Sequence, residues 1–366
     1  MAYGVVNADK MTTSDGVSSS GLYGFKNRII NGAMVIDQRN AGAVMNMTGA
    51  NYGTCDRWKF YYSAASKFTA QQNAGSITPP AGFTNYLGIT SLSAYTVGAG
   101  EEFDVCQFIE GYNVADLGFG SANAKTVTLS FWVRSSLTGT FGGALQNSGS
   151  SRSYVFSYTI SSANTWEQKS ITITGDTSGT WLTTNGLGIN CTFGIGQGSS
   201  LTNTAGSWYT GNYNNVTGGT SVVGTNGATF YITGVQLEKG STATSFDYRP
   251  YGTELALCQR YYWRTSGGGG SLAPTHMVGA FAYSGSSVGQ AYCAHPVTMR
   301  ANPTSTISSL SVWNGSSTAV TSIAATNSST IAGTLNLSTG SGSLSGYYNI
   351  ISPSSGTGYV DFSAEL

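Results

Sequence analysis

The feature of this sequence that most limits its fold is a two-residue alternation of apolar and polar side chains in short runs. The run 125–136, KTVTLSFWVRSS, is the clearest case. One face carries Val127, Leu129, Phe131 and Val133, and the other carries Thr128, Ser130, Trp132 and Arg134. Successive side chains of a strand point to opposite faces of a sheet, so this period predicts a β-strand with one buried face.

Similar runs recur through the first two thirds of the chain, separated by turn signals such as GD, NG and GG. They cover 27–37, 56–63, 67–72, 85–93, 101–112, 153–160, 165–174, 186–196 and 228–240. In 165–174 the period does not decide between an inward set of Trp166, Gln168, Ser170 and Thr172 and the opposite set that ends in Ile171 and Ile173. Because no helix is long enough for a βαβ crossover, the pattern predicts an antiparallel sandwich of jelly-roll type.

A second set of strand-like runs follows between 276 and 366 and predicts a second, smaller β-sandwich domain. Between the two regions, GTELALCQRYYWR predicts a short amphipathic helix over Glu254–Arg264, with Leu255, Cys258 and Tyr262 on one stripe and Leu257 and Tyr261 beside it. The run GGGG that follows predicts a flexible joint. The expected organisation is an N-terminal arm (1–26), a jelly-roll domain (27–250), a helical junction (251–270) and a C-terminal β domain (271–366).

The charge pattern argues against several classes of partner. Charged residues make up 9% of the chain and the formal net charge is zero, so neither a nucleic-acid nor an anionic-membrane footprint is expected. No apolar run approaches the roughly 20 residues that a membrane-spanning helix needs, and the N-terminus lacks the pattern of a signal peptide. The 5 cysteines are scattered without a C-x-x-C pair. We therefore expect reduced, mostly buried thiols in a protein that folds in a cytoplasm, with neither disulfides nor a zinc site.

Signals for catalysis are sparse, and the sequence predicts no enzymatic activity and no cofactor. His276 and His295 have no paired acid nearby, and no G-x-S-x-G elbow or phosphate loop is found. Glu102 and Asp104 share one face of a predicted strand, and paired carboxylates are what glycoside hydrolysis requires. We expect this pair to be a solvated strand end.

The segment AGSWYTGNYNNVTGG is the best candidate for a carbohydrate site. It places Trp208, Tyr209 and Tyr213 among Asn212, Asn214 and Asn215 in a polar loop. Sugar C–H faces stack on aromatic rings and sugar hydroxyls bond to amides, so Trp208, Tyr209, Tyr213 and Asn214 are the predicted contacts. In the alternative, Trp208 packs at the edge of the sandwich. Tyr61 and Tyr62 carry a weaker signal of the same kind, and Trp58 is expected in the core.

Four stretches, opening with NRIINGAM and continuing with TVTLSFWVRSS, TWEQKSITI and ATFYITGVQLEKG, resemble jelly-roll carbohydrate-binding modules over residues 27–248. That family often carries a structural calcium near its opening and closing strands. Here Ala33, Met34, Thr233 and Gly234 stand where the resemblance would place an acidic residue. No metal is therefore expected.

A second resemblance covers nearly the whole chain. MAYGVVNADK, KNRIINGAMVIDQRNAG, GVQLEKGSTATSFDYRPYGTELALCQRYYWR, HPVTMRANPT and YVDFSAEL are similar, in this order, to tail-fibre and related adhesion proteins of tailed bacteriophages. The resemblance implies a homotrimeric, non-enzymatic virion appendage, assembled in the host cytoplasm, whose arm attaches to other tail proteins and which adsorbs to host-surface polysaccharide. A structural connector or decoration protein of the virion is the alternative. Leu255, Cys258, Tyr261 and Tyr262 would then either plug the open end of the jelly roll or meet their copies about the fibre axis.

Overall fold

A computed structural model describes residues 25–49, 51–266, 278–286, 288–308, 311–313, 317–325, 329–339, 344–351 and 359–366. The chain forms two compact units, Met1–Tyr251 and Gly252–Leu366. Most of the predicted N-terminal arm (1–24), the glycine run 267–270 and His276 lie outside the described residues.

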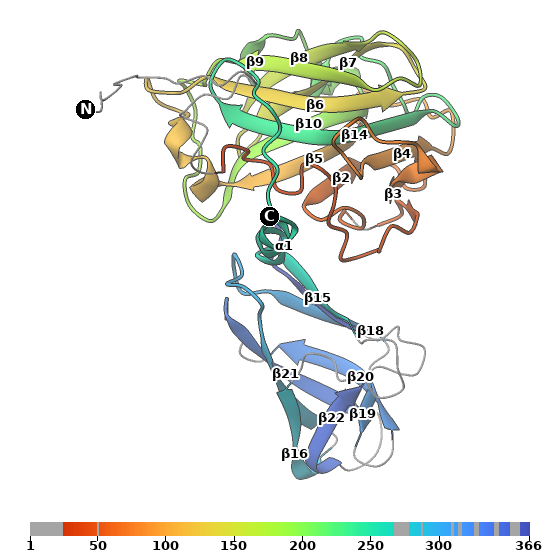
Figure 1. Cartoon of the computed structure of the whole chain (residues 1–366), viewed down its shortest axis with the longest axis vertical. Helices are drawn as coiled ribbons and strands as arrows, with labels where there is room; N and C mark the ends of the chain where they lie inside the picture. Colours follow the sequence, from red (N-terminus) through yellow and green to blue (C-terminus); the bar gives the residue numbers. More distant parts are fainter. Residues whose placement is uncertain are drawn as a thin grey trace, which may run out of the picture. The chain divides into compact units, whose positions relative to one another are not determined.

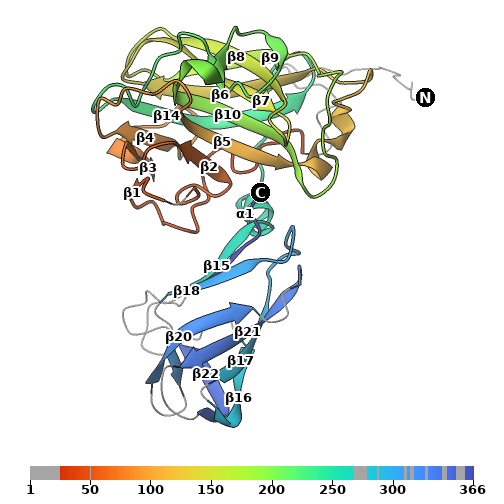
Figure 2. The same ribbon diagram turned by 180° about the vertical axis from the view of Figure 1, so that it is seen from behind.

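The first unit is built from two six-stranded sheets that lie face to face as two layers (Figure 1 and Figure 2). One sheet has the order β1 (Met45–Asn46), β3 (Phe68–Gln72), β4 (Leu87–Ser91), β14 (Thr229–Lys239), β6 (Val127–Ser135), β9 (Glu167–Ile173). The other has the order β12 (Ser207–Thr210), β8 (Arg152–Ile160), β7 (Gly139–Gln146), β10 (Leu187–Gln197), β5 (Glu102–Glu110), β2 (Trp58–Tyr62). All pairings within the two sheets are antiparallel. The predicted all-β, antiparallel sandwich is confirmed.

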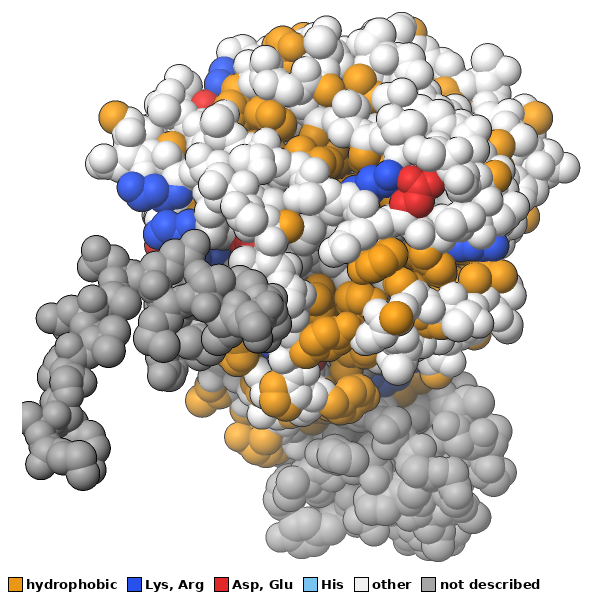
Figure 3. Space-filling model, turned by 45° about the horizontal axis from the view of Figure 1, so that its top comes forward, with side chains coloured by type: hydrophobic (Ala, Val, Ile, Leu, Met, Phe, Trp, Pro, Cys, Tyr) orange, Lys and Arg blue, Asp and Glu red, His pale blue; other side chains and the backbone are white. Residues whose placement is uncertain are grey.

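Short elements fill the connections of the first unit. The strands β11 (Thr202–Asn203) and β13 (Asn215–Val216) pair in parallel. The 3-10 helices in the described residues of this unit are η2 (Ala74–Ser76), η3 (Gly111–Asn113), η4 (Ala115–Leu117) and η5 (Ser199–Leu201). Charged side chains are few and scattered on the face that Figure 3 shows, in keeping with the low charged fraction.

The core lies between the two sheets and is rich in aromatic rings. Phe193 of β10 is at its centre, with ring centroids 5.0 Å from Phe131, 5.9 Å from Phe156 and 6.4 Å from Trp58. The apolar face predicted for 125–136 is buried, because Val127, Leu129, Phe131 and Val133 are each at most 1% exposed. In the 165–174 run the set ending in Ile171 and Ile173 turns inward: Ile173 is fully buried and Ile171 packs against the core.

The strand predicted over 27–37 is wrong. Asn31 and Met34 have φ of 56° and 59°, which breaks an extended ladder. The segment is nevertheless buried: Ile29 and Met34 belong to the core, and the backbone of Gly32 lies so close to β14 that an added Cβ would sit 2.1 Å from the carbonyl oxygen of Val235. The apolar side chains of 27–37 are therefore buried by close packing, although the segment does not pair as a strand.

The predicted helix is shorter than expected. α1 spans Tyr251–Gln259, with Glu254 in its first turn, where the helix dipole favours an acid. Tyr262, Trp263 and Arg264 belong instead to β15 (Tyr262–Ser266), which pairs with the strand at the C-terminus. Aromatic and β-branched residues favour strands, and this pairing overrides the helical period.

The second unit contains a three-stranded sheet and a closed six-stranded barrel. The sheet has the order β15, β23 (Tyr359–Ser363), β18 (Thr304–Ser308). The barrel has the order β16 (Val278–Ser286), β17 (Val288–Ala294), β21 (Ala332–Thr339), β20 (Ser317–Ala325), β19 (Ser311–Trp313), β22 (Leu344–Ile351). At the C-terminus, the alternate residues Val360, Phe362 and Ala364 are buried.

All five cysteines are buried, free thiols. Burial raises the pKa of Cys191 and of Cys293 to about 12, so both stay protonated at neutral pH and neither is poised as a nucleophile. Among the described residues, no helix is long and apolar enough to cross a membrane.

Candidate functional site

A pocket with a volume of about 240 Å³ opens on the outer face of the sheet that contains β5, β10 and β7. It follows from the strand period. On β5, Phe103 and Val105 point into the core, so Asp104 between them points outward; on β10, Asn190 and Thr192 do the same between core residues. The lining residues are Tyr61, Glu102, Asp104, Phe108, Gln146, Asn147, Ser148, Ser150, Leu187, Asn190, Thr192, Asn212 and Asn214.

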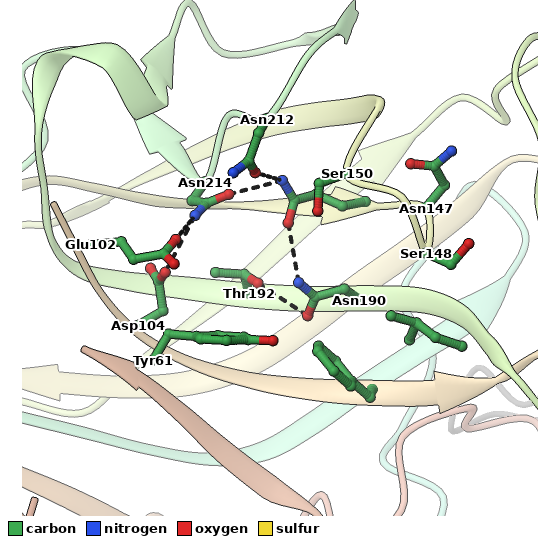
Figure 4. A pocket seen from close by; sticks show the side chains of 13 residues that line it. Tyr61, Glu102, Asp104, Asn147, Ser148, Ser150, Asn190, Thr192, Asn212 and Asn214 are labelled. Carbon is green, nitrogen blue, oxygen red and sulfur yellow. Dashed lines mark hydrogen bonds between the residues drawn. The ribbon is translucent and has the colours of Figure 1, made fainter. Parts of the chain in front are cut away.

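Two carboxylates lie side by side at one end of the pocket (Figure 4). Asn214 connects them: its amide Nδ2 donates to Glu102 Oε2 and lies 3.5 Å from Asp104 Oδ2. Gln197 Nε2 donates to the other oxygen of Asp104. Asp104 is 1% exposed, so the expectation of a solvated strand end is wrong for this residue.

Both carboxylates hold their protons more readily than usual. Burial, and after it the charge of Glu102, raise the pKa of Asp104 well above its usual range, while the hydrogen bond from Asn214 opposes the shift. Burial also raises the pKa of Glu102, again opposed by the Asn214 bond. The pocket therefore has an acidic end at which full ionisation is costly.

A chain of side-chain hydrogen bonds leads to this acidic end (Figure 4). The Thr192 hydroxyl donates to Asn190 Oδ1 at 3.1 Å, and Asn190 Nδ2 donates to Gln146 Oε1 at 3.1 Å. Gln146 Nε2 in turn donates to Asn214 Oδ1 at 2.8 Å and to Asn212 Oδ1 at 2.7 Å. The amides of Gln146, Asn190 and Asn214 are buried and held in place by one another.

Aromatic rings form another wall. Tyr61 of β2 and Phe108 of β5 have ring centroids 6.1 Å apart. The Lys59 ammonium lies 4.2 Å from the Phe108 ring centroid and 4.8 Å from that of Tyr61, so its charge rests on the rings. Burial lowers the pKa of Lys59 and raises that of Tyr61. The site thus joins an apolar surface to a set of fixed polar groups, which is the composition of a small-molecule site.

Of the predicted carbohydrate contacts, Asn214 lines the pocket, whereas Trp208, Tyr209 and Tyr213 do not. Trp208 lies on the edge strand β12, half-buried, and its Nε1 donates to the Thr174 carbonyl at 2.7 Å. Its ring meets Tyr154 and Trp181 edge-on, with centroids 5.3 and 5.5 Å away.

Tyr209 and Tyr213 are half-buried and contact each other edge-on at 5.9 Å. Through its backbone, Tyr213 also contacts the polar network: its N–H donates to Ser153 Oγ at 3.2 Å. The predicted segment therefore contributes to the pocket through its asparagines, not its rings.

The predicted junction residues lie around the end of α1. Cys258, Tyr261 and Tyr262 are buried, and Leu255 is half-buried. The Tyr262 hydroxyl donates to Asp361 Oδ1 at 2.7 Å, and the Ala364 N–H donates to the Tyr261 carbonyl at 2.7 Å. Tyr261 and Tyr262 thus anchor the C-terminal segment within the second unit.

Several pocket residues were not singled out from the sequence, among them Gln146, Asn190 and Thr192. The available signal was the polar residue at every second position of an otherwise apolar run, as in GINCTFGIG. No group of three or more His, Cys, Asp or Glu side chains suited to a metal ion occurs among the described residues.

Comparison with known proteins gives distant structural neighbours only. No family model matches the sequence, and no curated protein does. One similar structure is a Bacteroides thetaiotaomicron protein whose sugar-binding role is itself an inference (13% identity, TM-score 0.34, 59% of this chain and 100% of that one). A second is the family 11 carbohydrate-binding module of a Clostridium thermocellum cellulosomal cellulase (14%, TM-score 0.26, 55% and 98%).

A third is the enzymatically active domain of tailspike protein 4 of bacteriophage CBA120 (10% identity, TM-score 0.32). That match covers 58% of this chain but only 21% of the tailspike chain. The neighbours therefore include carbohydrate-binding modules and a phage tailspike domain, all at low identity. The chemistry of the pocket has to be derived from its own residues.

Proposed function

We propose that this protein is a carbohydrate-binding virion appendage of a tailed bacteriophage, and that the pocket on the outer sheet face holds the sugar. The observation that carries the proposal is the combination, in one pocket, of a tyrosine ring with fixed amides and carboxylates. A sugar ring offers a C–H face that packs on an aromatic ring and hydroxyls that both donate and accept hydrogen bonds. Preorganised partners reduce the entropy that binding costs.

The size of the pocket indicates how much of a glycan it takes. Its volume of about 240 Å³ lies below the range of about 300–1,000 Å³ that is usual for drug-sized ligands. We therefore expect the pocket to recognise one sugar unit, or the end of a chain, with the rest of the glycan outside it.

The virion role rests on the sequence motifs similar to phage tail fibres, from MAYGVVNADK to YVDFSAEL. With it we propose the homotrimer, attachment to other tail proteins through the N-terminal arm, and localisation in the virion. A monomer by light scattering at micromolar concentration would contradict the trimer.

We further propose that binding is not followed by hydrolysis. Glycosidases place two carboxyl groups about 5–9.5 Å apart, flanking the scissile bond. Here both carboxylates contact the same nitrogen of Asn214 and lie at one end of the pocket rather than on opposite sides of it (Figure 4), which supports a binding role. Incubation with host polysaccharide should release no oligosaccharide. Release that Glu102→Gln abolishes would show an enzyme instead.

The test of function is binding of the purified full chain to host cells, and its competition with phage for adsorption. Tyr61→Ala should weaken cell binding at least tenfold without unfolding the protein, because it removes the aromatic wall. Tyr112→Ala is the matched control, since Tyr112 is 62% exposed and does not line the pocket. No binding and no competition by the wild type would favour a structural connector or decoration protein.

A further inference from the structure

The direction of the hydrogen bonds in the pocket limits what a ligand can offer. In the series of hydrogen bonds from Thr192 through Asn190 and Gln146 to Asn214, each side-chain donor is already bonded to an acceptor of the protein. This series of hydrogen bonds ends at Glu102 and Asp104, which accept from Asn214. Two carboxyl groups provide about eight lone-pair sites when both are ionised, and about seven when one proton is retained. The bonds from Asn214 and Gln197 occupy only a few of them. The lone-pair sites that remain at the acidic end can therefore accept hydrogen bonds from a ligand.

The charges at the pocket point the same way. Among the described residues that line it, two are acidic and none is Lys, Arg or His. The nearby ammonium of Lys59 rests on the rings of Phe108 and Tyr61. A sugar carrying a carboxylate, sulfate or phosphate would bring further acceptors and a like charge to this end. Like charges placed together at an interface weaken binding by about a hundredfold or more, which would exclude such a group.

We propose that Glu102 and Asp104 determine specificity: they receive two neighbouring hydroxyl donors of an uncharged sugar and exclude glycans whose recognised unit is anionic. This inference rests on the proposed carbohydrate binding and names its ligand class. Tyr61 lies on the same side of the pocket as Asp104 (Figure 4), where its ring can pack on the C–H face of the sugar.

The experiment measures affinities of the full chain for matched oligosaccharides that end in a neutral hexose or in the corresponding uronic acid. We expect binding of at least one neutral series and about a hundredfold or more weaker binding of its uronic acid counterpart. Glu102→Gln and Asp104→Asn should each weaken neutral binding about tenfold and reduce the discrimination against the acid to a few-fold.

Asp116→Asn is the control, because this carboxylate is 46% exposed and pairs with Arg28 and Lys239 rather than lining the pocket. Its affinities should equal those of the wild type. If the wild type preferred the acid, and Tyr61→Ala abolished that binding, the proposed specificity would be overturned while carbohydrate binding in the pocket would stand. An unchanged neutral-to-acid ratio in both carboxylate variants, each still folded by circular dichroism, would also overturn it. Failure of every glycan series to bind the wild type would overturn the proposed function itself.

Discussion

Replacing Asn214 with alanine removes the side chain that connects the amide network to the two carboxylates. Asn214 is 4% exposed, accepts from Gln146 at 2.8 Å and donates to Glu102 and, at 3.5 Å, to Asp104. The variant should therefore lose both the stability of the first unit and the preorganisation of the pocket.

The magnitude follows from these bonds. A hydrogen bond to a charged group contributes about 1.5–3 kcal/mol and a neutral one about 1 kcal/mol. The contact with Asp104, at 3.5 Å, adds little. Gln146 keeps its bonds to Asn212 and Ser153. We expect a loss of about 3 kcal/mol in unfolding free energy. For a unit of this size that is a fall of about 6–12 °C in Tm.

The assay is calorimetric unfolding of the first unit, with Asn212→Ala as the matched control. Asn212 is exposed and contributes one acceptor to the same Gln146 nitrogen, at 2.7 Å, so its removal should cost less than about 1 kcal/mol. Well below the Tm of either variant, Asn214→Ala should also lose neutral-glycan affinity. Equal Tm values for the two variants would refute the claim that Asn214 supports the buried pair.

Three further predictions concern other parts of the fold. Trp208→Ala should lower the unfolding free energy of the first unit by about 3 kcal/mol in urea, because the ring is packed; weaker cell binding at unchanged stability would instead make it a ligand contact. Gly234→Ala should lower the first-unit Tm, since Gly234 has φ of 61° and a Cβ would lie 2.6 Å from the ring of Phe83; an unchanged Tm would contradict this. His295 accepts from Trp263 at 3.2 Å, and burial lowers the pKa of His295. The unfolded chain therefore binds a proton below about pH 6.5 that the folded unit does not, and stability should fall in acid. His295→Gln should remove that slope in thermal melts between pH 7.5 and 5.5; a slope that persists would assign it to other groups.

The sequence predicted the faces of the strands well, because burial follows the two-residue period directly. It failed where close packing replaced regular structure. The strand β7 was not predicted, since GTFGGALQ carries three glycines and glycine is a poor strand former. Two of them are needed for space: a Cβ on Gly143 would lie 2.0 Å from the Thr192 carbonyl oxygen, and one on Gly142 would lie 2.6 Å from Asn215 Oδ1.

The missed strand also hid part of the site. Gln146 ends β7 and is paired with Asn190 of β10, which pairs on its other side with Phe108 of β5. These residues are far apart in the sequence, so only the strand order brings their side chains together. Asn214 and the Glu102–Asp104 pair were visible as local patterns. Their meeting was not, because it depends on where the segment after β12 crosses the sheet.

The acidic end of the pocket is also hard to explain by folding alone. Because the folded pKa of Asp104 is raised, the folded state holds a proton that the unfolded chain releases above about pH 3.9. Stability contributed by this group is therefore lost as pH rises from that value through the raised pKa. Ionisation of Asp104 therefore costs stability, and repulsion from the neighbouring Glu102 adds to that cost. An amide or an apolar residue at Asp104 would leave the core face unchanged, since that face is filled by Phe103 and Val105. A ligand whose hydroxyls satisfy both carboxylates gives the pair a role that folding does not.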